Sequence, residues 1–273
     1  MLRLRLRRFP RGAAASAWPC FLLLLHLHLS AAAQAADADA LLTLKSSLDR
    51  SDRLPWRPDT APALCSAWPG VRQCAPAGRV TKLYLDNLNI TGPIVDAVGG
   101  LSSLEHLHLS NNNISGVLPT GLYRCRSLRL LDLSINNIGG KLPDDLGNRL
   151  GRNLRTLYFG ANRFEGSVLV SLCMLRNLRY LGLSECNFTG TVPAELGQLT
   201  KLKEFSVDTN AFDPGELPPL ENLTNLVILE AFDCNLVGDF PTCFGRMSKL
   251  RYLTSLTTHS QEPFPQEFGG SPI

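Results

Sequence analysis

The chain has 273 residues, with 27 lysines and arginines against 24 aspartates and glutamates. Five of the arginines lie in a leader, residues 1–35, that contains no acidic residue, so the remainder carries 22 basic and 24 acidic residues and a net charge of −2. This nearly balanced charge does not favour a nucleic-acid partner or a basic membrane-binding surface.

Residues 1–35 are predicted to be a secretory signal peptide. An arginine-rich start is followed by an apolar run from Trp18 to Leu29 and by the small-residue site Ala-Gln-Ala at 33–35, which is the usual order of such a signal. The apolar run is too short for a membrane span, and His26 and His28 interrupt it. An uncleaved anchor or a transit peptide is the alternative.

Residues 36–77 are predicted to form an N-terminal cap. Asp37 to Asp49 has acidic residues at its start and a stripe of leucines, which predicts a helix. Cys65 and Cys74 follow, nine residues apart and with Trp68 between them. In a secreted chain this spacing indicates a disulfide-closed loop. We expect it to seal the apolar end of the first coil, because terminal repeats need a cap.

A unit of 24 residues then recurs, with the pattern Leu-x-x-Leu-x-Leu-x-x-Asn-x-Ile-x-Gly-x-Leu-Pro clearest at residues 104–119. A fixed period of this kind predicts a leucine-rich-repeat solenoid: a right-handed α/β horseshoe with a parallel concave sheet. About seven repeats and the start of an eighth occupy residues 78–253, and a non-repeat tail occupies 254–273. The second leucine of each strand is taken as the anchor, at Leu83, Leu107, Leu131, Leu157, Leu181, Phe205, Leu229 and Leu253.

Five residues after the anchor, an asparagine is expected to lie inside the coil. A carboxamide both donates and accepts hydrogen bonds, so a column of asparagines can satisfy backbone groups of neighbouring coils. Cys186 and Cys234 occupy the same position in two repeats. The predicted ladder is Asn112, Asn136, Asn162 and Asn210.

Asn-x-Ser/Thr sequences predict N-linked glycans on a secreted chain, and we expect at least two of the sites to be occupied. A repeat that ends in Asn-x-Ser/Thr-Gly also generates such sequences by consensus alone. The sites are Asn89, Asn113, Asn187 and Asn222.

The helix, the Cys65–Cys74 loop and the Ser/Thr-Gly-x-Leu/Ile-Pro repeat ends resemble the plant-type leucine-rich-repeat extracellular domain, over about residues 37–253. The segments Phe-Asp-Pro-Gly-Glu-Leu-Pro at 212–218 and Cys-Asn-Leu-Val-Gly-Asp-Phe-Pro at 234–241 are most similar to the N-terminal part of ectodomains in the HAESA-like branch of receptor-like kinases. Members of that branch are peptide-hormone receptor kinases. They also carry further repeats, a second cysteine-pair cap, a membrane span and a kinase domain, none of which this sequence shows. The resemblance therefore implies a truncated ectodomain of a receptor-like kinase or receptor-like protein.

No sequence pattern of an enzyme, cofactor site or metal site was found. His106 and His108 lie two residues apart on one strand face and could be half of a metal site, but a contact surface is the favoured interpretation. We therefore expect neither enzymatic activity nor a cofactor nor a metal.

The concave face is the expected ligand-binding surface, because outward aromatic residues on it have no core to fill. The expected function is extracellular recognition of a peptide or protein, together with a co-receptor, in the apoplast or at the cell surface as part of a longer receptor. The alternatives are a secreted inhibitor of a cell-wall-degrading enzyme, of the polygalacturonase-inhibitor type, and a non-functional truncated product. The candidate residues are His106, His108, Tyr158, Tyr180, Glu230, Phe232 and Asp233.

Overall fold

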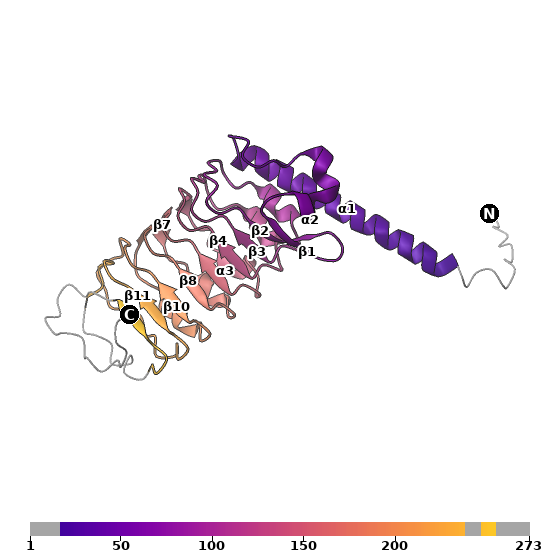
Figure 1. Cartoon of the computed structure of the whole chain (residues 1–273). Coiled ribbons are helices and arrows are strands. Elements are labelled where there is room, and N and C mark those ends of the chain that lie inside the picture. The colour runs from indigo at the N-terminus through magenta and orange to yellow at the C-terminus, as the bar shows by residue number, and fades with distance from the viewer. Residues whose placement is uncertain (1–16, 238–246, 255–273) are drawn as a thin grey trace, which may run out of the picture.

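The computed structural model describes residues 17–237 and 247–254. These residues form an elongated stack of coils with a long helix at its N-terminal end (Figure 1). The solenoid predicted from the 24-residue period is confirmed. The tail at 254–273 lies outside the described residues except for Thr254.

The concave side is one nine-stranded sheet. Its strands, in spatial order, are β1 (Val71–Cys74), β2 (Val80–Tyr84), β3 (His106–His108), β4 (Leu130–Asp132), β6 (Thr156–Tyr158), β8 (Tyr180–Gly182), β10 (Glu204–Ser206), β11 (Ile228–Glu230) and β12 (Tyr252–Thr254). The cap strand β1 is antiparallel to β2, and all later pairs are parallel. Each anchor faces the anchor of the next coil, from Leu83 opposite Leu107 to Leu229 opposite Leu253.

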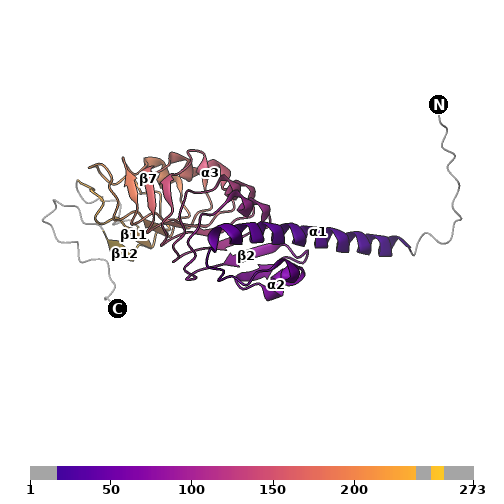
Figure 2. The ribbon, with the colours of Figure 1, turned by 90° about the horizontal axis from the view of Figure 1, so that it is seen from above.

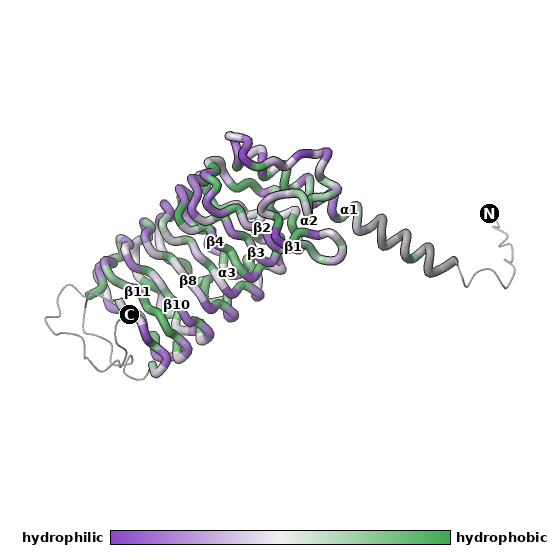
Figure 3. Tube along the Cα trace, in the orientation of Figure 1, coloured by the Kyte–Doolittle hydropathy of each residue, from purple (hydrophilic) through white to green (hydrophobic). Residues whose placement is uncertain are grey.

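The interior is a continuous stack of leucines, isoleucines and phenylalanines, most of them fully buried. Figure 3 shows apolar and polar stretches alternating along each coil, as a buried anchor with exposed neighbours requires. The asparagine column forms hydrogen bonds with backbone groups that face this apolar interior. Asn136 is 8% exposed, its amide donates to the carbonyls of Leu109, Leu133 and Ser134, and its oxygen accepts from the N–H of Ile114 at 2.9 Å.

The opposite side of each coil returns through a short helical turn. These turns are the 3-10 helices η2 (Asp96–Gly100), η3 (Thr120–Arg124), η4 (Val170–Met174) and η5 (Ala194–Gln198), and the α-helical turn α3 (Leu146–Arg149). The α-helical turn belongs to the one coil that is two residues longer, because the anchors Leu131 and Leu157 are 26 residues apart. Insertion is tolerated there, away from the strands.

A second, three-stranded parallel sheet was not predicted. It consists of β5 (Gly139–Lys141), β7 (Arg163–Ser167) and β9 (Asn187–Thr189). These strands come directly after the asparagine turn, where three neighbouring coils run extended and pair with one another. The leucine pattern marks only the concave strand, so it carries no signal for this pairing.

The cap is held by one disulfide and by stacked indoles. Cys65 and Cys74 are bonded with a Cα–Cα distance of 6.0 Å, as predicted. The rings of Trp56 and Trp68 stack at 5.4 Å, and the Trp68 Nε1–H donates to the Thr60 hydroxyl. The loop is completed by η1 (Pro58–Ala63) and α2 (Leu64–Ala67).

The cap helix is longer than expected. The leucine stripe predicts a helix over 37–49, whereas α1 runs without a break from Ala17 to Leu48 and its first half extends beyond the coils (Figure 2). Leucine and alanine dominate the leader from residue 17 onward and favour helix, and Pro19 lies in the first turn, where proline is tolerated. A hydropathy criterion finds no membrane-spanning helix among the described residues.

Candidate ligand-binding face

Each concave strand turns the residues on either side of its buried anchor towards the concave face, where most are at least partly exposed and Thr156, Gly182 and Ser206 are buried. The period of two in a strand places both on one face, and the parallel register aligns them into two columns across the sheet. The column before the anchor is Lys82, His106, Leu130, Thr156, Tyr180, Glu204, Ile228 and Tyr252. The column after it is Tyr84, His108, Asp132, Tyr158, Gly182, Ser206, Glu230 and Thr254.

An aromatic and histidine cluster covers the first three coils. The Tyr84 hydroxyl lies 3.1 Å from His106 Nδ1, and the Tyr84 ring is 4.1 Å from the His108 ring. On the next strand, Asp132 Oδ2 is 3.7 Å from His108 Nδ1, and its other oxygen accepts from the Ser134 hydroxyl at 2.6 Å. The predicted candidates His106 and His108 thus lie together, with two partners that were not predicted.

Burial and charge set the electrostatics of this cluster. Partial burial, reinforced by the positive charge of Lys82, lowers the pKa of His106. Burial opposes ionisation of Asp132, but the contact with His108 and the hydrogen bonds from Ser134 outweigh it and lower the pKa of the carboxyl. The cluster therefore favours the neutral form of the His106 imidazole and the ionised form of the Asp132 carboxyl.

A second cluster lies over the fourth to sixth coils. A Cβ on Gly182 would come within 2.7 Å of Tyr158 Cδ1, so the missing side chain leaves room for the Tyr158 ring over β8. The ring extends from β6 towards Glu204 on β10, two strands away. Burial and the contact with Glu204 raise the pKa of Tyr158, and burial raises the pKa of Glu204. Tyr180 lies on the intervening strand.

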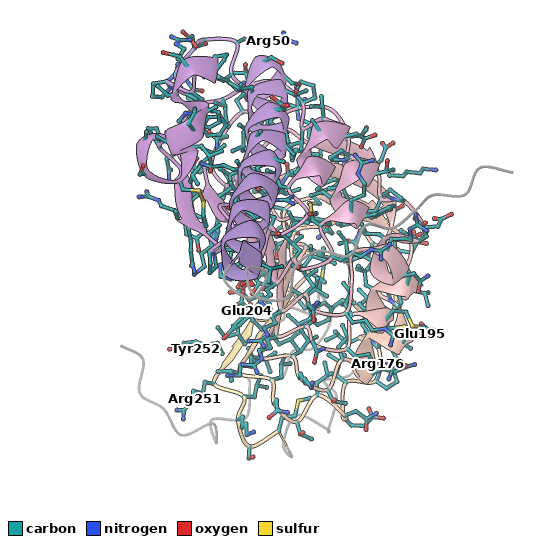
Figure 4. All side chains as sticks on the ribbon, turned by 90° about the vertical axis from the view of Figure 1, so that its right-hand side faces the viewer. Arg50, Arg176, Glu195, Glu204, Arg251 and Tyr252 are labelled. Carbon is teal, nitrogen blue, oxygen red and sulfur yellow. A yellow bond between two sulfur atoms is a disulfide. The ribbon has the colours of Figure 1, made fainter. Side chains whose placement is uncertain are left out.

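Further acceptors extend the face towards the last described coils. The Ser206 hydroxyl donates to Glu230 at 2.7 Å; beyond the strand ends, the Ser184 hydroxyl donates to the buried Asp208 at 2.5 Å. The Glu230 carboxylate is therefore partly oriented by its neighbouring coil. Figure 4 shows Glu204 and Tyr252 on the same side of the molecule.

Phe232 and Asp233 were predicted as outward strand positions, and this placement is wrong. Strand β11 ends at Glu230, and Asp233 has a φ of 46°, in the left-handed region used by turns. Both residues are exposed, Phe232 by 36%. They lie in the turn beyond the strand because the chain already bends inward there towards the buried Cys234.

The leucine pattern missed several residues on this face. Tyr84, Asp132, Glu204 and Tyr252 occupy the same offsets from their anchors as the residues that were predicted, and Tyr252 is 64% exposed. Reading both outward columns in full finds all four. Gly182 has no such signal, because its importance comes from the Tyr158 ring of the preceding coil, 24 residues earlier in sequence.

The remaining predicted sites are placed as follows. The four glycosylation candidates, Asn89, Asn113, Asn187 and Asn222, are exposed, and their occupancy stays a prediction. Cys186 and Cys234 are buried in the asparagine column and, like Cys125 and Cys173, are not disulfide-bonded. Within 17–237 and 247–254, no group of three or more metal-ligating side chains is assembled.

Three segments match known families. The leucine-rich-repeat N-terminal domain matches residues 34–72, and leucine-rich repeats match residues 78–138 and 177–199. An inactive leucine-rich-repeat receptor-like serine/threonine-protein kinase of Arabidopsis thaliana is 53% identical over 55 residues, which is 20% of this chain and 8% of that kinase.

Solved plant ectodomains share the fold. The Arabidopsis receptor kinase HAESA, in a complex with the peptide hormone IDA and the co-receptor SERK1, is 34% identical with a TM-score of 0.73, over 78% of this chain and 36% of that one. The ectodomain of GASSHO1/SCHENGEN3 from Arabidopsis thaliana, in a complex with CASPARIAN STRIP INTEGRITY FACTOR 2, is 31% identical with a TM-score of 0.69, over 81% and 29%. The chain thus spans about a third of these ectodomains.

Proposed function

We propose that this chain, a plant-type leucine-rich-repeat solenoid with its N-terminal cap, is an extracellular recognition module that binds an extended peptide along its concave sheet. Solenoids of this kind offer an extended concave binding surface, and the similar receptor kinase HAESA is known in a complex with a peptide hormone. The observation that carries the proposal is the uninterrupted row of outward tyrosines, histidines and carboxylates across consecutive strands.

The two clusters suit different parts of one ligand. Tyr84, His106 and His108 offer ring faces and hydrogen-bonding groups, and Tyr158 and Tyr180 offer a second aromatic surface farther along the sheet. Large, rigid aromatic side chains provide contact area at a small loss of conformational entropy. A peptide crossing the strands would bury its side chains between these rings.

The carboxylates indicate the ligand's charge. Asp132, Glu204 and Glu230 all face the concave surface, so a peptide with at least one basic residue near its centre has the complementary charge. We propose that Asp132 and Glu204 orient this residue, one from each cluster.

Secretion and a co-receptor complete the proposal. Removal of residues 1–35 as a signal peptide would deliver the module to the apoplast, where carbohydrate on the exposed asparagines would shield the lateral face. The HAESA complex contains a co-receptor, and a second protein closing over the bound peptide is proposed here too. N-terminal sequencing of the chain secreted by plant cells tests the first step, with a start near Ala36 expected.

Binding is tested with a library of synthetic linear peptides that have the sequences of secreted plant peptides. Each peptide is made with and without a central basic residue. The secreted chain should retain a subset of the basic peptides. The variant Tyr158→Ala/Tyr180→Ala should bind these peptides with an affinity lower by about tenfold or more, and its circular dichroism spectrum should be unchanged. The matched control is Val170→Ala/Met174→Ala, which removes two exposed side chains from η4 on the opposite side.

The control should bind as the parent chain does. If both double variants bind the retained peptides equally well, the concave face is not the binding site. If the library contains no ligand in either charge form, peptide recognition itself is contradicted.

A further inference from the structure

A row of cations runs along the edge at which the chain enters the concave sheet. In the third to sixth coils the residue two positions before each anchor is basic, and all four are exposed: Arg129, Arg155, Arg179 and Lys203. Their backbones are directly bonded, because the N–H of each later member donates to the carbonyl of the previous one at 2.7–2.8 Å. The charges therefore repeat at the spacing of neighbouring strands, about 4.8 Å.

The cation row is hardly neutralised. Arg129 has an ion pair with Glu105 at 3.5 Å, in which the Arg129 side chain is exposed and the Glu105 side chain is partly exposed. For Arg155, Arg179 and Lys203, no ion pair or side-chain hydrogen bond is found within the described part of the chain. The row is also bounded: Glu105 occupies the equivalent position in the preceding coil, and Val227 in the following one.

A second row of cations provides a comparison. Arg126, Arg152, Arg176 and Lys201 lie two or three residues earlier in the same coils and are also exposed. Arg176 donates to Gln198, and Lys201 donates to Asn177 at 2.5 Å, so part of this outer row is occupied by neutral acceptors. In Figure 4, Arg176 projects on the opposite side from Arg251 and Tyr252, which occupy the inner-row and adjoining positions of the last described coil.

We propose that Arg129, Arg155, Arg179 and Lys203 form a binding site for a linear polyuronate, an acidic polysaccharide with one carboxylate on each sugar. Guanidinium groups bind carboxylates with paired hydrogen bonds, and four cations in register fit a ligand whose charges also repeat. Net charge does not explain such binding, because the chain after the leader carries −2.

The spacing favours a polysaccharide over an acidic peptide. An extended peptide presents side chains on one face only about every 6.6–6.8 Å, which falls out of step with charges about 4.8 Å apart, whereas each unit of a polyuronate carries its own carboxylate. Tyr180 adjoins Arg179 on the concave side, and a tyrosine offers both an apolar ring face and a hydroxyl, as a sugar ring does. The site is separate from the histidine cluster and does not depend on peptide binding.

The test measures binding of a short oligogalacturonate to the secreted full chain. The inner variant Arg129→Gln/Arg155→Gln/Arg179→Gln/Lys203→Gln should weaken binding by about tenfold or more. The outer variant Arg126→Gln/Arg152→Gln/Arg176→Gln/Lys201→Gln removes the same number of charges and should change it by about threefold or less. Both substitute exposed residues, and their circular dichroism and melting should match the parent chain.

Ligand controls separate charge from chemistry. The methyl-esterified oligosaccharide, which keeps the sugars and loses the charges, should not bind, and affinity for the acid form should fall with added salt. Polyglutamate of the same charge should bind more weakly. Equal losses in the inner and outer variants, or polyglutamate binding as tightly as the oligogalacturonate, would overturn the assignment. His108→Ala should leave the affinity unchanged; a loss as large as in the inner variant would show that the two surfaces are one site.

Discussion

Asp37 and Arg79, 42 residues apart in sequence, are joined by a buried ion pair that fastens the cap helix to the first coil. Arg79 Nε donates to Asp37 Oδ1 at 2.8 Å, and the backbone N–H of Val80 donates to the other oxygen at 2.7 Å. Asp37 has 0% exposure. The carboxylate therefore satisfies both the guanidinium and the first residue of β2, which ties α1 to the concave sheet.

Replacing this carboxylate should destabilise the cap. Asp37→Ala leaves the buried Val80 N–H without its acceptor and removes the anionic partner of Arg79, which keeps only Gly100 O and Ser102 Oγ; we expect a loss of about 3 kcal/mol in the free energy of unfolding. Asp39→Ala, two residues along the same helix and exposed, should change it by less than about 0.5 kcal/mol. Urea denaturation followed by circular dichroism measures both. Equal effects would show that the contact does not hold the cap.

The asparagine column should be separable from the adjacent turn. Asn136→Ala removes the acceptor of the Ile114 N–H and the donor shared by three carbonyls, and should cost about 1–3 kcal/mol. The side chain of Asn137, the next residue, donates a hydrogen bond to the exposed Asn113 side chain, so Asn137→Ala should cost less than about 0.5 kcal/mol. If denaturation shows the same loss for both, the assigned position of the column within the coil is wrong.

A side chain added at Gly182 should destabilise the protein only because it would displace the Tyr158 ring. In Gly182→Ala the new methyl group meets the ring, and displacing it should cost about 1–3 kcal/mol. The φ of Gly182 is not among the positive values, so the backbone accepts alanine. In a Tyr158→Ala background the same substitution should be nearly neutral, which a double-mutant cycle measures. An undiminished cost in that background would point to a backbone effect instead.

The histidine cluster should make stability depend on pH. Because burial and Lys82 lower the pKa of His106 below its ordinary value of 6.5, the unfolded chain binds this proton more readily than the folded chain. The stabilisation by neutral His106 is complete above about pH 6.5 and is lost as the pH falls towards the folded pKa. The free energy of unfolding, measured by urea denaturation between about pH 7 and about pH 5, should therefore depend less on pH in His106→Gln than in the parent chain.

Nuclear magnetic resonance gives an independent measurement of the same effect. The ring protons of His106 should titrate with a midpoint below 6.5. Lys82→Gln removes a nearby positive charge and should move this midpoint upward. A midpoint at or above the ordinary value in the parent chain would contradict the burial of the ring on this face.

The local repeat determined much of the architecture without further information. A leucine or phenylalanine every 24 residues places each anchor opposite the next, and Leu107 opposite Leu131 follows directly from that count. The positions of the asparagines and of the cap cysteines are similarly a matter of counting. Such features depend on a residue's place within its own coil, and one coil specifies them.

Tertiary structure decided which outward side chains meet. Tyr158 reaches across Gly182 towards Glu204, and Tyr84 joins His106 and His108, through contacts between residues about one or two repeats apart. The length and rotamer of one side chain and the space left by another determine these contacts, and the repeat pattern treats all outward positions alike. Pairing between neighbouring coils also produced the unpredicted second sheet, and the inward bend towards Cys234 misplaced Phe232 and Asp233. The early start of α1 has a local cause, the leucines and alanines of the leader. The sequence alone determined the scaffold and its period, and only the packing of neighbouring coils determined the surface that a ligand would contact.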